Sequence, residues 1–288
     1  MSEPSTSTND WKRRTPIQAF TDIVLSTPLF AMVGGVVTYA ILAPPSLREG
    51  LWSTATCFMA GLCVTLANHR YFSHKSFKTH RLTQALLALC SCWALQKGPL
   101  WWAANHRAHH RHSDTPDDPH SPIHGIWWSH MGWTLHPNTH KARKDPFIAD
   151  LLKFPELHWM DRLWFLPPLL YLALLFIWGG VSAMIWGYLL PILIQFQFTY
   201  LVNSACHLWG GQPFHTDDTS RNNVVVALLT LGEGWHNNHH RCQFSARQGF
   251  FWYEIDVTYW VICALERLGI IWDVKRPPAR IYAERSKG

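Results

Sequence analysis

The histidines of this chain are concentrated in three short motifs. The motifs are NHRYFSH, HRAHH and HNNHH, and a further histidine lies four residues after an asparagine in NSACH. Neutral imidazole is the commonest protein ligand for iron, zinc and copper. These motifs contain more histidines than one metal ion can coordinate, and they therefore predict a two-metal site. Its candidate ligands, nine of the chain's 18 histidines, are His69, His74, His106, His109, His110, His207, His236, His239 and His240.

The spacing of these residues predicts how they meet. In HRAHH and HNNHH the histidines occupy positions i, i+3 and i+4, which share one face of a helix. Asn203 and His207 are four apart and stack in the same way. His69 and His74 are five apart, so they converge only if their helix ends or loosens between them.

The ligand type favours redox iron over zinc, because zinc sites prefer four ligands and often include cysteine. Carboxylates are expected to orient the ligand imidazoles. The candidates for this role are Asp114, Asp117, Asp118, Asp217, Asp218 and Glu233. We interpret the remaining histidines as surface or core residues; they are His80, His112, His120, His124, His130, His136, His140, His158 and His215.

Apolar residues lie in long blocks that are nearly free of charge. A membrane-spanning helix needs about 20 such residues, and about 17 at minimum. The blocks predict spans at about 23–43, 51–68, 163–179 and 181–203, with Gly179 and Gly180 dividing the last two. Buried core helices are the alternative, but the blocks lack the polar face of a surface helix. We therefore expect an all-α integral membrane protein with four transmembrane helices and a cytoplasmic helical cap that carries the histidine-rich di-iron site.

Basic residues predict the orientation. Lys12, Arg13 and Arg14 precede the first span, twelve Lys and Arg lie between His69 and Arg162, and nine follow the fourth span. The positive-inside rule then places both termini and the histidine motifs in the cytoplasm. We expect a disordered tail at 1–15, one membrane domain at 16–275 and a C-terminal tail at 276–288. The seven cysteines read as free thiols, and no nucleic-acid-binding motif is present.

HRYFSH, HRAHH and GWHNNHH, with NSACH between the last two, resemble the membrane fatty acyl desaturases of the stearoyl-CoA (delta-9) type. The similarity extends over about residues 50–275. It implies two irons held by the nine clustered histidines, with Asn203 holding a bound water. It also implies that O2 is the co-substrate and that a cis double bond, at the delta-9 position, enters a saturated acyl chain.

The resemblance further implies a bent substrate tunnel shaped by Gln96, Trp102 and Thr199. Tyr200 stands where the family usually has a Trp. Gly61 and Cys57 lie two and three helical turns before His69, on its side of the helix, and are candidates for the tunnel floor. A helix-contact role for Gly61 is the alternative.

The carrier of the acyl chain stays open between acyl-CoA and a lipid ester. SHMGW (129–133) lacks the basic pair that follows it in animal acyl-CoA enzymes. QKGPLWW (96–102) and HSDTPDDPHSP (112–122) resemble bacterial, cyanobacterial and plastid members. No cytochrome b5 domain is fused to the chain, so we expect a separate electron donor, a ferredoxin or a cytochrome b5 with its reductase. The motif style favours a bacterial plasma membrane, with the endoplasmic reticulum as the alternative.

Three other functions fit parts of the pattern. A di-iron fatty acyl hydroxylase shares the scaffold, and sequence motifs alone do not separate alcohol from alkene products. A histidine-rich metal transporter would place its ligands near mid-membrane, whereas these motifs lie outside the apolar blocks. A soluble carboxylate-type di-iron protein would need paired Glu-x-x-His motifs, which this sequence lacks.

Overall fold

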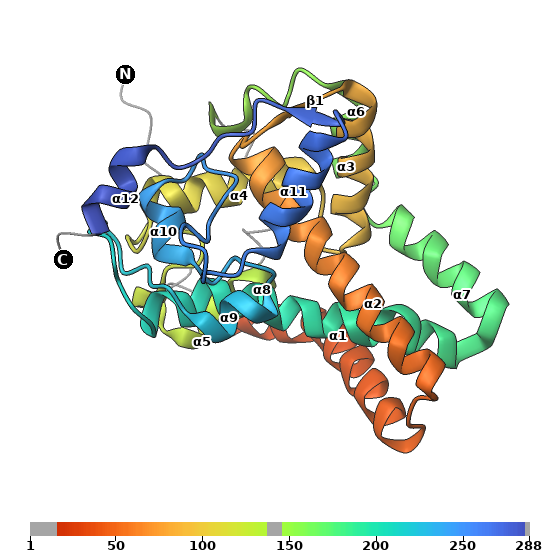
Figure 1. Ribbon diagram of the computed structural model, residues 1–288. Helices are drawn as coiled ribbons and strands as arrows, with labels where there is room; N and C mark the ends of the chain where they lie inside the picture. Colours follow the sequence, from red (N-terminus) through yellow and green to blue (C-terminus); the bar gives the residue numbers. More distant parts are fainter. Residues whose placement is uncertain (1–15, 137–145, 286–288) are drawn as a thin grey trace.

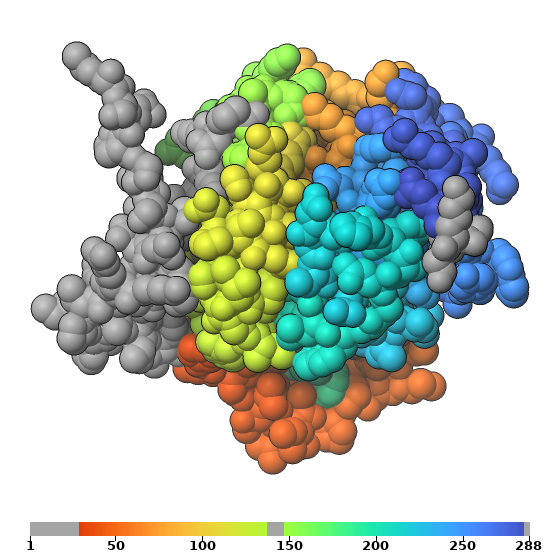
Figure 2. Space-filling view, turned by 90° about the vertical axis from the view of Figure 1, so that its left-hand side faces the viewer, coloured from red at the N-terminus to blue at the C-terminus, as the bar shows by residue number. Residues whose placement is uncertain are grey.

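The computed structural model describes residues 16–136 and 146–285 of the chain. The predicted tail at 1–15 lies outside the described residues. Long helices project to the lower right of Figure 1, and shorter helices gather at the upper left. In Figure 2, the first part of the described chain, coloured red to orange, extends below the rest of the molecule.

The long helices come in two antiparallel pairs (Figure 1). In the first pair, α1 (Pro16–Leu42) is followed by α2 (Leu47–Leu62), which continues as the π-helix η2 (Cys63–Ser73). Ser46 starts α2 with a capping box, in which its hydroxyl accepts from Glu49 N and the Glu49 carboxylate accepts from Ser46 N. The second pair consists of α7 (Leu166–Met184), the π-helix η7 (Ile185–Leu189) and α8 (Leu190–Leu208). The chain turns back at Gly179 and Gly180 inside α7, so the end of α7 runs with η7 and α8.

The remaining elements form a cap at one end of the long helices. Its helices are α3 (Arg81–Trp93), α4 (Pro99–His112), α5 (Ile126–His130), α6 (Pro155–Arg162), α9 (Val224–Leu229), α10 (His236–Arg241), α11 (Val257–Arg267) and α12 (Ala279–Arg285). Short 3-10 turns are η3 (Pro122–His124), η4 (Gly132–Leu135) and η6 (Pro146–Ile148). The strands β1 (Lys78–Thr79) and β2 (Ile271–Trp272) pair antiparallel, and isolated bridges join Asn222 to Gly211 and to Trp235. The described residues are otherwise helices and loops, and their mostly helical character agrees with the predicted helical fold.

A hydrophobic core fixes the cap to the end of η2. Phe72 and Phe77 pack with Leu100 of α4, Leu157 of α6 and Ile262 of α11 in one buried cluster. Because these residues come from distant parts of the sequence, their burial holds η2, α4 and the C-terminal segment in one unit. The predicted C-terminal tail takes part in the packing of the cap, since Ile281 of α12 is buried in a cluster with Phe214 and Phe250.

The long helices expose their apolar side chains. Within the described residues, Leu47–Ser73 and Leu166–Leu208 are long and apolar enough to cross a membrane, and only 39% and 22% of their most apolar windows are buried. Leu29–Leu42 is a shorter apolar helix. Leu174 and Ile177 on α7 are 64% and 81% exposed. Such surfaces argue against the buried-core alternative and suit contact with lipid.

The predicted division at Gly179 and Gly180 is present. Both residues have non-helical backbone angles inside the segment assigned to α7. Gly180 has φ +63° and ψ −153°, a conformation that is almost restricted to glycine. The long apolar stretch therefore bends back here instead of running as one 43-residue helix.

Replacing Gly180 with Ala is expected to destabilise the protein by about 1–3 kcal/mol, because its backbone conformation strains a residue with a Cβ atom. A Cβ atom added at Gly180 or at Gly50 would meet nothing within 4 Å, so packing does not interfere at either position. Gly50→Ala, inside α2, is the matched control and should be neutral or stabilising. Thermal unfolding of the purified protein in detergent measures both, and an unchanged melting temperature for Gly180→Ala would contradict the expectation.

Candidate metal centre

Helix α4 carries three of the clustered histidines into the centre of the cap. Pro99 occupies the first turn of α4, where a missing N–H costs nothing. The Asp161 carboxylate accepts hydrogen bonds from the backbone N–H groups of Leu100 (3.0 Å) and Trp101 (2.9 Å). These contacts fix the start of α4, and its last two turns hold His106, His109 and His110.

The π-helix η2 brings His69 and His74 together. A π-helix closes its hydrogen bonds between residues five apart, and His74 N donates to His69 O at 3.2 Å. The wider turn places the two rings on one face, with 4.8 Å between their centroids. The helix thus loosens between the two histidines, as their spacing requires, and does not end at His69.

All nine clustered histidines gather in two adjacent groups. In each group the candidate ligand atoms lie within 4.8 Å of one another. The first, called here the five-histidine group, contains His69, His74, His106, His110 and His239. The second, called the four-histidine group, contains His109, His207, His236 and His240.

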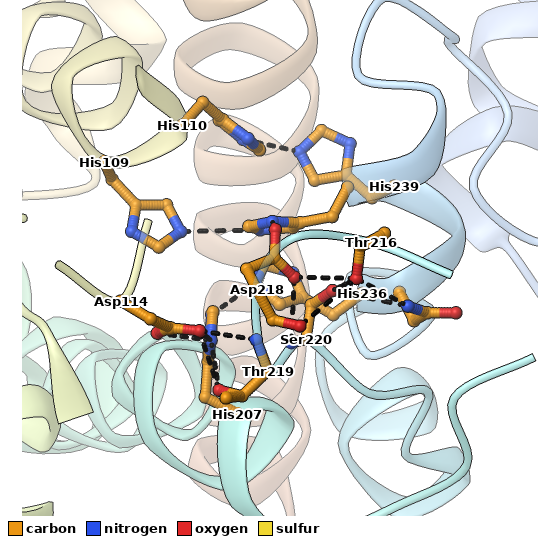
Figure 3. A network of polar contacts seen from close by, with 12 residues as sticks. His109, His110, Asp114, His207, Thr216, Asp218, Thr219, Ser220, His236 and His239 are labelled. Atoms are coloured by element: carbon orange, nitrogen blue, oxygen red, sulfur yellow. Dashed lines mark hydrogen bonds and ion pairs between the residues drawn. The ribbon is translucent and has the colours of Figure 1, made fainter. Parts of the chain in front are cut away.

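The rings of both groups face each other through their Nε2 atoms. In the five-histidine group, Nε2 of His110 lies 2.9 Å from Nε2 of both His106 and His239. In the four-histidine group, Nε2 of His207 lies 3.1 Å from Nε2 of His236. Figure 3 shows rings from α4, α8 and α10 that face one another, such as His110 and His239. Convergent nitrogens with one lone pair each suit a metal ion at the centre of each group.

Four of the six predicted carboxylates contact a ligand candidate on its other ring nitrogen. Asp118 lies 2.9 Å from Nδ1 of His109, and Asp218 lies 2.6 Å from Nδ1 of His240. Asp114 lies 3.0 Å from Nδ1 of His207 (Figure 3). Glu233 contacts Nδ1 of His69. The other two, Asp117 and Asp217, are exposed.

The protonation states favour metal binding. Burial lowers the pKa of His106, His110, His236 and His239 well below the usual value, so these rings are neutral at neutral pH. Burial also lowers the pKa of His240, to about 4. Neutral imidazole is the form that binds metals.

The raised pKa of His109 indicates that its surroundings favour a positive charge. Burial opposes a charge on its ring, yet the neighbouring Asp118 carboxylate raises the pKa of His109 on balance. Among the described residues, the buried Nδ1 atoms of His110, His236 and His239 have no hydrogen-bond partner. The residues therefore fit a pair of metal ions, because Nε2 atoms converge in both groups and carboxylate oxygens lie behind four of the nine rings.

An apolar cavity of about 220 Å³ adjoins both groups. Its walls include His106, His109 and His236, and Asn203 lies in the wall one helical turn before His207. Apolar wall residues come from five separate elements, α1, η2, α4, η4 and α8. They include Leu29, Val64, Trp133 and Phe196.

The predicted tunnel residues Gln96, Trp102, Thr199 and Tyr200 all line this cavity. Gln96 Nε2 donates to Thr199 Oγ1 at 2.8 Å, and Trp102 Nε1 donates to Gln96 Oε1 at 3.3 Å. This chain of hydrogen bonds joins α4 to α8 across the cavity. It therefore fixes the shape of the wall next to the metal centre.

Gly61 and Cys57 are not among the described residues that line the cavity. A Cβ on Gly61 would lie 3.1 Å from Leu231 Cδ1 and 3.3 Å from Gln195 Oε1. Gln195 itself forms part of the wall. Gly61 thus sits one residue behind the cavity, in the helix-contact position that was the alternative for it.

Two residues of the site escaped the sequence analysis. His120, interpreted as a surface or core residue, lines the cavity, and its ring centroid lies 4.3 Å from that of His109. In the sequence, the position of His120 two residues after the carboxylate candidate Asp118 could have indicated that it belongs to the site. Arg70 is fully buried and donates to Glu233, the carboxylate that contacts His69. For Arg70, a charged residue directly after His69 at the end of an apolar block could have indicated a role at the site.

Comparisons with known proteins agree with this geometry. Residues 49–262 match the family model described as fatty acid desaturase. The chain is 43% identical over 218 residues to a palmitoyl-monogalactosyldiacylglycerol delta-7 desaturase of Arabidopsis thaliana, covering 75% of this chain and 59% of that protein. It is 41% identical over 216 residues to an sn-1 stearoyl-lipid 9-desaturase of Anabaena variabilis, covering 75% and 79%.

The name of a third relative gives CoA as the carrier of the acyl chain, whereas the names of the first two give lipids. The chain is 37% identical over 262 residues to an acyl-CoA C20 delta5-desaturase of Anemone leveillei, covering 88% of this chain and 83% of that protein. A probable lipid desaturase of Arabidopsis thaliana is 40% identical, and the match spans 62% of its length. The family model alone covers well over half of this sequence. The chain therefore belongs to the fatty acid desaturase family, which is membrane-associated.

Proposed function

We propose that this protein is a membrane-bound, oxygen-dependent fatty acyl desaturase with two iron ions at the two histidine groups. Family membership indicates an oxidoreductase that acts on acyl chains. The observation that carries the proposal is the position of nine convergent histidines beside an apolar cavity. Such a cavity suits an alkyl chain, and the histidines lie at its wall.

Bound at the two histidine groups, a pair of iron ions would supply the O2 activation that is needed to oxidise an unactivated methylene. The protein's residues have other tasks. The cavity walls hold two neighbouring methylenes next to the metal centre and exclude water from them. The hydrogen bond that Gln96 donates to Thr199 and the one that it accepts from Trp102 hold the cavity wall in a fixed shape, which sets the conformation of the acyl chain beside the metal centre. Asn203, in the wall next to His236, holds a water molecule near the four-histidine group.

The proposed topology has four membrane spans, with both termini and the metal centre in the cytoplasm. The exposed apolar surfaces of α2 and α7 and the turn at Gly179 and Gly180 support it. The spans then correspond to α1, α2 with η2, the part of α7 before the turn, and the segment from the turn to the end of α8. The distribution of basic residues supports the orientation.

The proposed substrate is a saturated acyl chain carried by a lipid ester or by CoA, and the proposed bond position is delta-9. The relatives include both lipid-linked and CoA-linked enzymes, and the Anabaena relative is named a 9-desaturase. A ferredoxin or a cytochrome b5 with its reductase supplies the electrons. The proposed location is a bacterial plasma membrane.

Expression in a desaturase-deficient host tests the activity. The wild-type protein should produce a monounsaturated acid, and gas chromatography with mass spectrometry gives the position of its double bond. His106→Ala should abolish the product, because His106 belongs to the five-histidine group. A hydroxylated acid in place of the alkene would assign the protein to the hydroxylases, and an unchanged product from His106→Ala would rule out this site.

Iron binding should stabilise the folded protein. A ligand at 100 times its dissociation constant adds about 2.7 kcal/mol to the free energy of unfolding. Thermal unfolding before and after chelation should therefore show a clear loss of stability. His240→Ala should lose most of the metal-dependent difference, whereas His215→Ala, an exposed histidine, should keep it. Equal differences in both variants would contradict the assignment.

Gly61 should influence the preferred chain length indirectly. A Cβ at this position would lie 3.1 Å from Leu231 Cδ1 and 3.3 Å from Gln195 Oε1, so a side chain here displaces these neighbours, and Gln195 lines the cavity. Gly61→Ala should shift the products towards shorter acids, and Gly61→Phe should shift them further. Gly34→Phe is the control, because a Cβ there meets nothing within 4 Å. A product profile that is identical across chain lengths in all three variants would refute this role.

A further inference from the structure

The carboxylates that contact the histidines are divided unequally between the two groups. Asp114, Asp118 and Asp218 all contact members of the four-histidine group. The five-histidine group has Glu233 alone among the described residues. We propose that the four-histidine group is the tight metal position, which fills first and keeps its ion, and that the five-histidine group is the exchangeable one. This inference rests on the proposed function.

The three aspartates of the four-histidine group are held in place by other donors. Asp118 accepts from the backbone N–H groups of Asp114 and His120, each at 3.0 Å. Asp114 accepts from Thr219 N at 2.6 Å. These bonds come from the loops that flank the site, so the carboxylates stay in position when the metal is absent.

Asp218 is anchored in the same way. Its carboxylate accepts from Ser220 N and from Thr216 Oγ1, each at 3.0 Å (Figure 3). The side chains of Asp114, Asp118 and Asp218 are 9%, 0% and 12% exposed, so solvent screens their charges little. Three negative charges thus surround one metal position.

Glu233 of the five-histidine group shares a buried arginine with Asp256, and this positive charge partly offsets the charge of the Glu233 carboxylate. Arg70 Nη2 lies 3.1 Å from Glu233 Oε1 and 2.9 Å from Asp256 Oδ1. Arg70 also donates to Ala246 O at 2.7 Å, and its side chain is fully buried. Its positive charge lies next to the one carboxylate that the described residues bring to this group, and it opposes the binding of a second cation nearby.

The fifth histidine does not offset this difference. An imidazole that replaces a water ligand exchanges one neutral donor for another, whereas each carboxylate adds a negative charge beside a divalent ion. Loss of one hydrogen-bonded partner behind a ligand typically lowers metal affinity about 10- to 100-fold. The surplus of two carboxylates therefore corresponds to roughly 100-fold or more in affinity, because the effects of the two partners multiply.

Metal retention in two ligand variants provides the test. The purified full-length protein is loaded with Fe2+ without oxygen and then dialysed against a graded series of chelator concentrations. Wild type should release one equivalent of iron well before the other. His74→Ala, in the five-histidine group, should keep the firmly held equivalent. His207→Ala, in the four-histidine group, should lose it.

Carboxylate variants separate charge from coordination. Asp218→Asn should weaken the firmly held equivalent about 10- to 100-fold and leave the other unchanged. Glu233→Gln should weaken only the exchangeable equivalent. Asp217→Asn is the matched control, because Asp217 is exposed and is the chain neighbour of Asp218. Iron content and chelator competition give the readout, which a general loss of folding would not divide between the two equivalents.

The possible results distinguish this inference from the proposed function. Failure of the wild type to bind two equivalents of iron would refute the di-iron function itself. Release of both iron equivalents at the same chelator concentration would refute the inference alone. So would a firmly held iron that is kept by His207→Ala and lost by His74→Ala. Equal effects of Asp218→Asn and Glu233→Gln on both equivalents would also overturn it.

Discussion

Nine imidazole rings converge in the interior of the cap, and most of the architecture around them serves to make this convergence stable. Each neutral ring carries a single N–H, so only some of the facing Nε2 pairs can be hydrogen bonds, and the other Nε2 lone pairs face each other without a donor. The carboxylates behind His69, His109, His207 and His240 add negative charge that needs compensation. A cation at the centre of each group satisfies both requirements. The family to which the chain belongs gives such a centre an oxidative role on acyl chains.

The fold supplies the positions through unrelated local devices. A π-helix turns His69 and His74 to one face, Asp161 fixes the start of α4, and α8 extends from the apolar region into the cap. Arg70 links the end of η2 to Glu233 and Asp256, so the C-terminal segment is tied to the same site. A change in any of these elements moves ligands that are distant in the sequence. The metal centre and the packing of the cap are therefore one cooperative unit.

The gathering of the histidines could be predicted from the sequence because seven of them lie in helical i, i+3 and i+4 spacings or follow an asparagine by four residues, and because the family pattern repeats all the motifs; the π-helix that joins His69 to His74 was visible only in the structure. The aspartates and Glu233 were found among six candidates, yet only the structure separates them from Asp117 and Asp217, which are equally close to the motifs in sequence. The pairing of Arg70 with Glu233 joins residues 163 positions apart, and no local pattern reports such a contact. For the same reason the sequence analysis left Gly61 open between the tunnel floor and a helix contact, and only the structure shows that Gln195 of α8, which lines the cavity, is its neighbour.

X-ray absorption spectroscopy at the iron edge, on protein loaded to full occupancy, tests the central claim most directly. The account predicts a ligand shell of nitrogen and oxygen with strong outer-shell scattering from imidazole rings. Sulfur in the ligand shell, or iron without imidazole scattering, would contradict it. Either result would mean that the convergent histidines are not the ligands of the metal.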